Sequence, residues 1–471
     1  MKPPTNCLNL DKTMKTHLRF SRKLSSLAIA LLTLPAVAQT QPHTKSTMLA
    51  LRPYMGWSSW SFLKGKPTEE KVKAQIDALF AAKLPELGYR NINLDAGWTD
   101  GYDDHGVPKP NLATFPDGMD GFGAYLHGRG LLFGIYLNPG IDQKLYDANP
   151  LIAGTTSHIH DIADTSQPGS THKGSYKIDF SKPAASAYIN SIVRQFARWK
   201  VDFVKFDFVG PGGGNLPADN REELRQWHAA ILRSGRPIWL ELSNYLSIDQ
   251  APLWRATANG WRIESDVECY ACGRSTDPAV KGNLTQWSKI ADRFNDVRQW
   301  IPYAKPGGWN DLDSLDLGNG DKDGITPAER QSTFIFWAIS CAPLYLGSDL
   351  THMDPADLAL ISNHDLIAID QAGIPATPLD IQSLRNRTRQ AWITVNRDGS
   401  YILSLFNLSP DSANIKFDWH EVDALRNTHF AQYPPKMTDL ITNTSLPASP
   451  DGIDMKLDSH ASRVFRLMLA K

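Results

Sequence analysis

Residues 204–207 read Val-Lys-Phe-Asp, a short apolar run that ends in a carboxylate, and the helical pattern Arg221–Leu232 follows them. The same kind of run recurs seven more times between Tyr54 and Gly347. The other runs are Met55–Trp57, Ile92–Asp95, Phe133–Tyr136, Ile238–Glu241, Trp261–Glu264, Gly308–Asp311 and Pro343–Leu346. Further helical patterns lie between them, such as Glu69–Leu84, Pro183–Trp199 and Pro327–Ile339. Eight strand-then-helix units predict an α/β fold, a closed (β/α)8 TIM barrel whose active-site face lies at the polar ends of the runs.

The pattern changes after about Ala376. Four later runs read as strands: Ala391–Asn396, Tyr401–Asn407, Ile415–Trp419 and Val464–Leu467. The first two are joined around Asp398-Gly399, which is a hairpin signal, and no helical pattern is visible among the four. We therefore predict a catalytic barrel over residues 39–376 and a C-terminal antiparallel β-sandwich domain over residues 377–471.

The first 38 residues have the pattern of a cleavable signal peptide. Basic residues precede an apolar run over residues 25–38 that is too short to span a bilayer. The run ends in Ala36-Val37-Ala38, so we predict cleavage before Gln39, with Met14 as the natural start. The protein is then exported to the periplasm or the medium, and its mature chain has no membrane span.

The charge balance argues against nucleic acid as a partner. The chain has 49 Lys and Arg residues against 50 Asp and Glu residues, a formal net charge of −1, so no basic excess exists to hold a phosphate backbone. The flexible loop Gly210–Gly214 lacks the Lys-Ser/Thr of a phosphate-binding loop. The oligomeric state stays open.

Two of the four cysteines stand close together, in the segment Cys269-x-x-Cys272. A structural zinc site would need further ligands, and the segment lacks a second pair. In an exported protein a small disulfide loop is the favoured interpretation, with a free pair as the alternative.

Carboxylates at the predicted strand ends suggest acid–base and nucleophilic chemistry. Lys205 and Asp207 are two residues apart, so they share one face of the fourth strand, and a cation keeps a neighbouring carboxylate ionised. Asp266 follows the sixth strand, so it can point into the same barrel mouth. One ionised carboxylate and one proton donor are the machinery of a glycosidase. A strand-end ion pair without chemistry is the alternative.

Further polar and aromatic residues lie at the ends of the predicted strands. They are Asp95, Tyr136, Arg262 and Asp313, together with the tryptophans Trp57, Trp60, Trp98, Trp239, Trp261 and Trp309. Carboxylates accept hydrogen bonds from sugar hydroxyls, and aromatic faces cover apolar sugar surfaces. Core packing is the alternative for each tryptophan. The eight strand-end runs contain no histidine, which counts against a metal-dependent hydrolase, so no metal and no cofactor is expected.

At these residues the sequence resembles glycoside hydrolase family 27, the family of α-galactosidases and α-N-acetylgalactosaminidases. The matching pieces run in the family's order along the whole barrel. They are Met55–Trp60, Asn93–Trp98, Phe133–Tyr136, Lys205–Asp207, Trp261-Arg262 with Asp266, Pro306–Asp313, Trp337–Leu344 and Gly347–Leu350. The resemblance implies a barrel followed by an antiparallel β domain, in agreement with the pattern of runs.

The resemblance also implies a retaining mechanism without metal or cofactor. Asp207 stands at the position of the nucleophile and Asp266 at that of the acid/base. Lys205 and Arg262 stand at positions that hold sugar hydroxyls, and weaker binding candidates are Trp60, Asp95, Tyr136, Glu241 and Asp313. The expected activity is release of terminal α-D-galactose from oligosaccharides or polysaccharides.

Two departures from the family's pattern leave the sugar open. α-Galactosidases of the family usually carry two adjacent aspartates on the second strand, whereas here Ala96 follows Asp95. The segment Glu241–Asn244 also differs from the family's Cys-Glu-Trp-like stretch, which shapes the 2-position of the sugar. A β-L-arabinopyranosidase, an enzyme similar to isomaltodextranase and a non-catalytic carbohydrate-binding barrel are therefore alternatives.

Overall fold

The computed structural model describes residues 49–270, 272, 284–384, 387–447 and 449–469. The predicted signal peptide, residues 1–38, lies outside this part of the chain. The described residues form one compact unit. The boundaries at 39–376 and 377–471 remain predictions.

Eight parallel strands form the larger sheet, in the order β12-β11-β10-β9-β5-β2-β1-β13. They are β1 (Met55–Ser58), β2 (Asn91–Leu94), β5 (Leu132–Leu137), β9 (Phe203–Phe206), β10 (Trp239–Leu242), β11 (Gly260–Arg262), β12 (Trp309–Asp311) and β13 (Leu344–Leu346). Each overlaps one of the predicted runs. Leu315, just after β12, forms a parallel bridge with Leu346, so the two ends of the curled sheet meet. The predicted TIM-like fold is confirmed.

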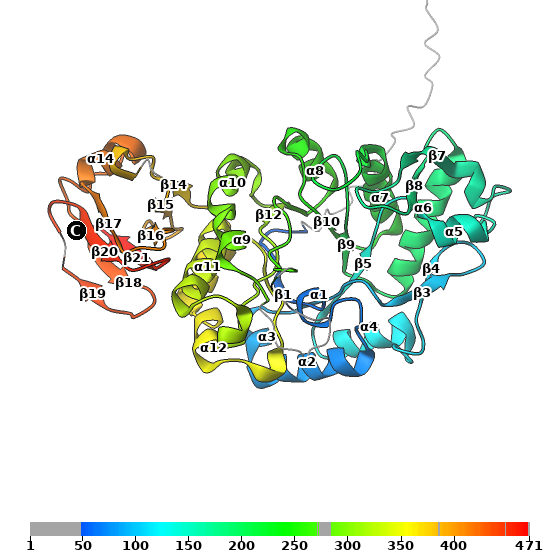
Figure 1. Cartoon of the computed structure of the whole chain (residues 1–471), viewed down its shortest axis with the longest axis horizontal. Helices are drawn as coiled ribbons and strands as arrows, with labels where there is room; N and C mark the ends of the chain where they lie inside the picture. Colours follow the sequence, from blue (N-terminus) through cyan, green and yellow to red (C-terminus); the bar gives the residue numbers. More distant parts are fainter. Residues whose placement is uncertain (1–48, 271, 273–283, 385–386, 448, 470–471) are drawn as a thin grey trace, which may run out of the picture. The chain divides into compact units, whose positions relative to one another are not determined.

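Helices follow the strands and flank the sheet (Figure 1). The four predicted helices are present as α2 (Glu69–Ala81), α6 (Pro183–Arg198), α7 (Arg221–Ser234) and α11 (Pro327–Ser340). The others in this region are α1 (Trp60–Leu63), α3 (Leu84–Leu87), α4 (Gly118–Gly128), α5 (Gln143–Ala148), α8 (Ala251–Thr257), α9 (Trp287–Ala291), α10 (Arg293–Trp300), α12 (Pro355–Ile361) and α13 (His364–Ala372). Helix α11 begins at a capping box, in which Thr326 and Glu329 each accept from the other's backbone N–H.

Short elements lie in the loops between the main strands. Two small antiparallel sheets consist of β3 (Thr99–Tyr102) with β4 (Pro108–Pro110), and of β6 (Ile141–Asp142), β8 (Ser175–Ile178) and β7 (Ala163–Pro168). The 3-10 helices are η1 (Ile159–Ile162), η2 (Ile248–Gln250), η3 (Ile301–Tyr303), η4 (Gly320–Asp323), η5 (Leu350–His352) and η6 (Gln382–Leu384). They belong to loops that no periodic pattern marked in the sequence.

The C-terminal part is antiparallel, as predicted. A six-stranded sheet has the order β14 (Thr377–Pro378), β15 (Arg389–Val395), β16 (Tyr401–Asn407), β21 (Ser462–Met468), β18 (Lys436–Asp439) and β19 (Ser445–Leu446). A second sheet pairs β17 (Ala413–Phe417) with β20 (Ile453–Leu457). The predicted hairpin is the pairing of β15 with β16.

The expectation that no helix occurs in the C-terminal part was wrong. Helix α14 (Trp419–Arg426) follows β17 directly. Its start is a capping box, in which the Asp418 side chain accepts from the Glu421 N–H and the Glu421 side chain accepts from the Asp418 N–H. Trp419 and Val422 bury the inner face of the helix against the β core. The Asp-x-x-Glu spacing before an apolar residue was the signal for this helix.

Aromatic packing joins the barrel to the C-terminal sheet. Phe336 of α11 contacts the rings of Trp392 and Phe406 at centroid distances of 5.4 and 5.9 Å. The Gln331 amide donates to the Ser462 carbonyl across the same contact. This explains why α11 is buried on nearly all sides.

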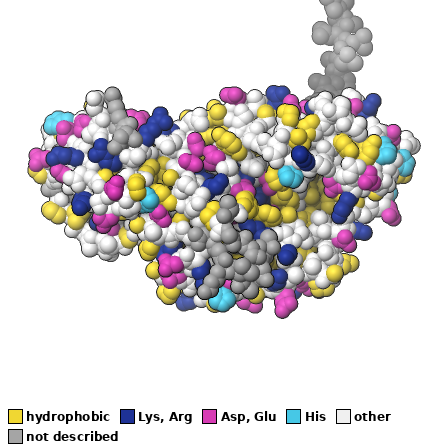
Figure 2. Space-filling model, viewed as in Figure 1, with side chains coloured by type: hydrophobic (Ala, Val, Ile, Leu, Met, Phe, Trp, Pro, Cys, Tyr) yellow, Lys and Arg dark blue, Asp and Glu magenta, His cyan; other side chains and the backbone are white. Residues whose placement is uncertain are grey.

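The surface shows charges of both signs. Basic and acidic side chains alternate over the visible face rather than gather in a patch of one sign (Figure 2). Among the described residues, no helix is both long and apolar enough to span a membrane.

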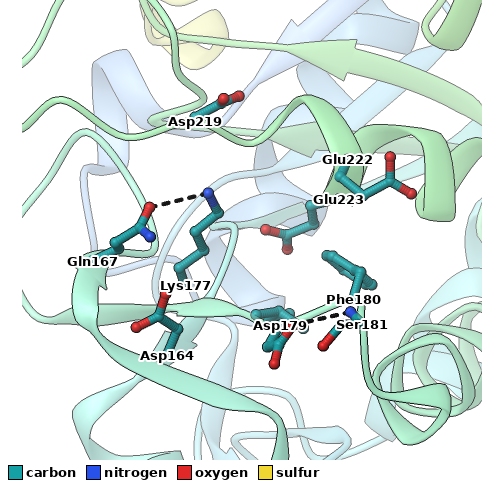
Figure 3. Close-up of a pocket in the computed structure, with 10 residues that line it drawn as sticks. Asp164, Gln167, Lys177, Asp179, Phe180, Ser181, Asp219, Glu222 and Glu223 are labelled. Atoms are coloured by element: carbon teal, nitrogen blue, oxygen red, sulfur yellow. Dashed lines mark hydrogen bonds between the residues drawn. The ribbon is translucent and has the colours of Figure 1, made fainter.

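A cavity of about 380 Å³ lies among the loop strands β7 and β8 and the start of α7 (Figure 3). Glu223 is buried at its wall and accepts hydrogen bonds from Gly140 N (3.0 Å) and from the Asn220 amide (3.3 Å). Burial raises the pKa of Glu223 to about 7, although these hydrogen bonds lower it. Below about pH 7 the folded protein thus favours the protonated carboxyl group.

We expect this burial to make stability depend on pH. Folded Glu223 holds its proton more tightly than the unfolded chain, so its stabilising effect is complete below about pH 4.5 and is lost as the pH rises through about 7. Replacing Glu223 by Gln removes this dependence. As the pH rises between these limits, the free energy of unfolding of the variant should increase by about 3 kcal/mol relative to that of the wild type. Urea unfolding across this range measures the shift.

The matched control is Glu222→Gln on the same helix, where the side chain is half exposed and pairs with Arg225. This variant should not reproduce the shift of about 3 kcal/mol, because it leaves the buried carboxyl group unchanged. A constant difference for Glu223→Gln as well would contradict the raised pKa.

Candidate active site

The carboxyl end of β9 carries a cation between two carboxylates. Lys205 Nζ lies 2.7 Å from Asp95 Oδ2 and 3.9 Å from Asp207 Oδ2. Burial opposes the charge of Lys205, but Asp95 and Asp207 raise its pKa above the ordinary value, so the ammonium persists. Burial raises the pKa of Asp95, and the Lys205 ammonium works against this. The strands β2 and β9 thus bring together three of the predicted residues.

Asp207 is buried and fixed by two donors. Its Oδ1 accepts from the backbone N–H of Phe208 at 2.8 Å, and Tyr136 forms a side-chain hydrogen bond with the same carboxylate. Burial, then Asp207 and Asp95, raise the pKa of Tyr136, so this phenol remains a donor. Phe208 has φ +54°, a conformation that non-glycine residues seldom adopt and that is common near active sites. The predicted nucleophile therefore has a single fixed orientation.

The second predicted carboxylate, Asp266, lies in the loop after β11. Arg262 Nη2 donates to its Oδ1 at 2.5 Å, and Tyr270 donates to its Oδ2 at 2.7 Å. The other end of the guanidinium, Nη1, lies 3.2 Å from Asp313 Oδ2. Arg262 also interacts electrostatically with Asp207, so one buried cation acts on both predicted catalytic carboxylates.

Asp313 forms an ion pair with the guanidinium of Arg262. Its carboxylate accepts hydrogen bonds from Val267 N and the Tyr345 hydroxyl at 2.9 and 3.0 Å. Although burial opposes ionisation, Arg262 and Arg293 hold the pKa of Asp313 well below its usual range. The described contacts of Asp313 are with the protein itself, so its predicted contact with sugar stays a prediction.

Glu241 lies inside the barrel. Its Oε2 accepts from Trp239 Nε1 at 2.7 Å, and burial, then the neighbouring Asp311, raise its pKa well above the usual value. Trp239 belongs to the buried cluster with Tyr54 and Phe203. Among the described residues, Glu241 forms no hydrogen bond or ion pair with Asp207 or Asp266, and its binding role stays a prediction.

Of the six strand-end tryptophans, only Trp60 is partly exposed, and its Nε1 donates to the Tyr270 hydroxyl at 2.9 Å. The other five are buried: Trp57, Trp98, Trp239, Trp261 and Trp309. The expectation that these tryptophans concentrate at a sugar-binding mouth was therefore wrong for five of them. Parallel strands with helices outside and side chains inside are covered on both faces, so large aromatics there fill the core.

Three residues that sequence reasoning missed surround Asp266. Besides Tyr270, Glu268 lies in the same loop and contacts the ammonium of Lys64 at 3.7 Å. Oxygens of Asp266, Glu268 and Asp313 lie within 4.8 Å of one another, a spacing that could suit a cation. Arg262 and Lys64 already supply positive charge at this cluster. The signal for Glu268 was its place two residues after Asp266.

A cavity of about 440 Å³ opens beside Ala96. Asp100, Tyr136 and Asn138 also line it. Its size lies within the range of small-molecule sites. On this side of Asp95 the site thus has a neutral methyl group and free space, where a second adjacent aspartate would place a carboxylate.

The comparisons with known proteins agree with this geometry. The sequence model of the family described as alpha galactosidase A matches residues 53–146 and 175–372. Alpha-galactosidase 2 of Arabidopsis thaliana is 30% identical over 378 residues, which cover 79% of this chain and 80% of that protein. Alpha-galactosidase A of Cellvibrio japonicus is 26% identical over 459 residues, 95% of this chain and 99% of the relative.

Solved structures show the same fold. A GH27 β-L-arabinopyranosidase from Geobacillus stearothermophilus, in complex with arabinose, has a TM-score of 0.77 at 26% identity and covers 90% of this chain and 98% of its own. Alpha-galactosidase I from Mortierella vinacea has a TM-score of 0.69 at 22% identity, over 90% of this chain and 98% of its own. The family's sequence model matches more than half of the present chain. The chain therefore belongs to glycoside hydrolase family 27, the α-galactosidase family, and is an O-glycosyl hydrolase.

Proposed function

We propose that the protein is an exported, retaining glycoside hydrolase that releases terminal α-D-galactose from α-galactosides. One observation carries the proposal. Asp207 and Asp266 come from β9 and from the loop after β11, and the buried Arg262 interacts with both. Two carboxylates in one mouth, one fixed beside a cation and one on a loop, supply a nucleophile and an acid/base.

In the first step, Asp207 attacks the anomeric carbon while the bond from that carbon to the leaving oxygen breaks. The proton of Asp266 passes to the leaving oxygen, so the released sugar or alcohol is neutral. A covalent glycosyl-enzyme remains on Asp207. Because the negative charge of Asp207 is consumed, Asp266 keeps its new charge at lower electrostatic cost.

In the second step, Asp266 takes a proton from water, and the water oxygen bonds to the anomeric carbon. The bond to Asp207 breaks, which restores its carboxylate. Two inversions at one carbon leave the configuration retained. Lys205 and Arg262 neutralise the carboxylates between the steps and offer hydrogen-bond donors to sugar hydroxyls.

Removal of the nucleophile tests this assignment. Asp207→Ala should lower kcat on 4-nitrophenyl α-D-galactoside by about a thousandfold or more, because no other group can form the covalent intermediate. Asp451→Asn, an exposed change in the C-terminal part, is the control and should match the wild type. Proton NMR of the first sugar released should show the α-anomer. Wild-type kinetics in the Asp207 variant, or release of the β-anomer, would refute the mechanism.

A second candidate, a β-L-arabinopyranosidase, is supported by Ala96 and by the similarity to the Geobacillus enzyme. The two sugars differ in the hydroxymethyl group, which β-L-arabinopyranose lacks. The open space beside Ala96 accepts either sugar. Asp100, which also lines the cavity, supplies a carboxylate from the loop that can bind the additional hydroxyl.

Two aryl glycosides distinguish these candidates. We expect kcat/KM on 4-nitrophenyl α-D-galactoside to exceed that on 4-nitrophenyl β-L-arabinopyranoside by about tenfold or more, because the larger sugar makes additional contacts. The opposite ratio would assign the arabinopyranosidase activity. If neither glycoside nor any other of a small panel is cleaved, the enzyme is not the hydrolase proposed.

Export is supported by the pattern over residues 14–38 and by the disulfide between Cys269 and Cys272, which confirms the predicted pairing. N-terminal sequencing of the native enzyme should begin at Gln39. A native enzyme that retains residues 14–38 and stays inside the cell would contradict export.

A further inference from the structure

The disulfide between Cys269 and Cys272 closes a small ring three residues after Asp266. Tyr270 lies inside this ring, and its hydroxyl donates to Asp266 Oδ2 at 2.7 Å. The same hydroxyl accepts from Trp60 Nε1 at 2.9 Å. The unassigned cysteine pair thus presents a phenol to the carboxylate that we assign as acid/base.

The two oxygens of Asp266 are held from different sides. Arg262, on β11, binds Oδ1, and Tyr270 binds Oδ2. Neither partner alone fixes the carboxylate, because a single hydrogen bond leaves rotation about it free. With both, Asp266 has one orientation, and a second lone pair of Oδ2 remains for the leaving oxygen.

Lys64 keeps the two aromatic rings in place. Its ammonium lies 5.1 Å from the ring centroid of Trp60 and 4.9 Å from that of Tyr270. The side chain is only 9% exposed, and among the described residues its nitrogen has no hydrogen-bond partner but contacts the two rings and the Glu268 carboxylate. A cation over two aromatic faces attracts both of them.

The hydrogen bond from Tyr270 becomes stronger when Asp266 loses its proton. A hydroxyl bound to a carboxylate forms a charge-assisted bond, about twice as strong as one between neutral groups. The N–H of Trp60 polarises the hydroxyl further. Desolvation, then Glu268 and Asp266, raise the pKa of Tyr270 above its ordinary value, so the hydroxyl keeps its proton.

We propose that Tyr270 is a positioning residue for Asp266, and that the Cys269–Cys272 disulfide holds Tyr270 in this place. Tyr270 needs such a restraint because 55% of it is exposed, whereas Cys269 is buried and is fixed by a backbone bond to Leu284. The inference rests on the proposed function, in which Asp266 protonates the leaving oxygen. It predicts that the first step depends on Tyr270 only where that proton is needed.

Leaving groups of different acidity test the role. For Tyr270→Phe we expect kcat/KM on melibiose, whose sugar leaving group needs the proton, to fall about 10- to 100-fold. On 2,4-dinitrophenyl α-galactoside, which leaves without a proton, kcat/KM should change less than about threefold. On this substrate kcat and KM of the variant should fall together, because the second step still uses Asp266 as a base.

The control is Tyr433→Phe, at a similarly exposed tyrosine in the C-terminal part, which should match the wild type on both substrates. Equal losses of Tyr270→Phe on both substrates would show a structural role and overturn the inference, and so would no loss on either. If the wild type cleaves neither substrate, the proposed function is overturned instead.

The ring is tested by replacing Cys269 and Cys272 together by Ser. The double variant should lose kcat/KM on melibiose selectively, as Tyr270→Phe does, with a melting temperature near that of the wild type. Wild-type selectivity in the double variant would show that the disulfide does not hold Tyr270.

Discussion

The active-site end of the barrel depends on one buried cation, the guanidinium of Arg262. It lies 2.5 Å from a carboxylate oxygen of Asp266 and 3.2 Å from one of Asp313. Removing a charge from water costs several kcal/mol per ion unless a partner compensates, so the buried Arg262 depends on the carboxylates that it contacts. Asp313 reaches the guanidinium from a residue with φ +78°, which non-glycine residues seldom adopt. Arg262, at the end of β11, thus connects the loops after β11 and β12, and the position of Asp266 follows from this.

Most of the fold was predictable, because its signals are local. The eight runs alternate with helical patterns, and each run became a strand of the parallel sheet. The hairpin around Asp398-Gly399 was equally local. Helix α14 was missed because its eight residues are too few for a clear period, although the Asp418–Glu421 box marked its start. Which tryptophans are buried was not predictable. A strand that is covered on both faces shows no alternation of polar and apolar residues, so its sequence does not separate side chains in the core from side chains at the barrel mouth.

The site was predictable where strands place it and not where loops do. Asp95, Lys205 and Asp207 lie at the carboxyl ends of parallel strands, which must meet at one edge. Lys64, Glu268 and Tyr270 come together through contacts of 3.7 to 4.9 Å between segments about 200 residues apart. No period in the sequence encodes such a contact. The cysteine pair marked the loop, but only the path of the chain shows that it directs a phenol toward Asp266.

The two catalytic carboxylates differ in how they are held, and the proposed chemistry gives a reason. Asp207 directly follows a strand, is 11% exposed, and must form a bond at one carbon, which a fixed and dry position favours. Asp266 lies on a loop with 28% of its side chain exposed, and it must first give a proton to one oxygen and then take one from water. A group that exchanges protons with solvent needs access to it, so a strand end deep in the mouth would suit it poorly. The loop provides access but little rigidity. Arg262 and Tyr270 restore that rigidity from two sides, as the Phe208 N–H and the Tyr136 hydroxyl do for Asp207 at the strand end.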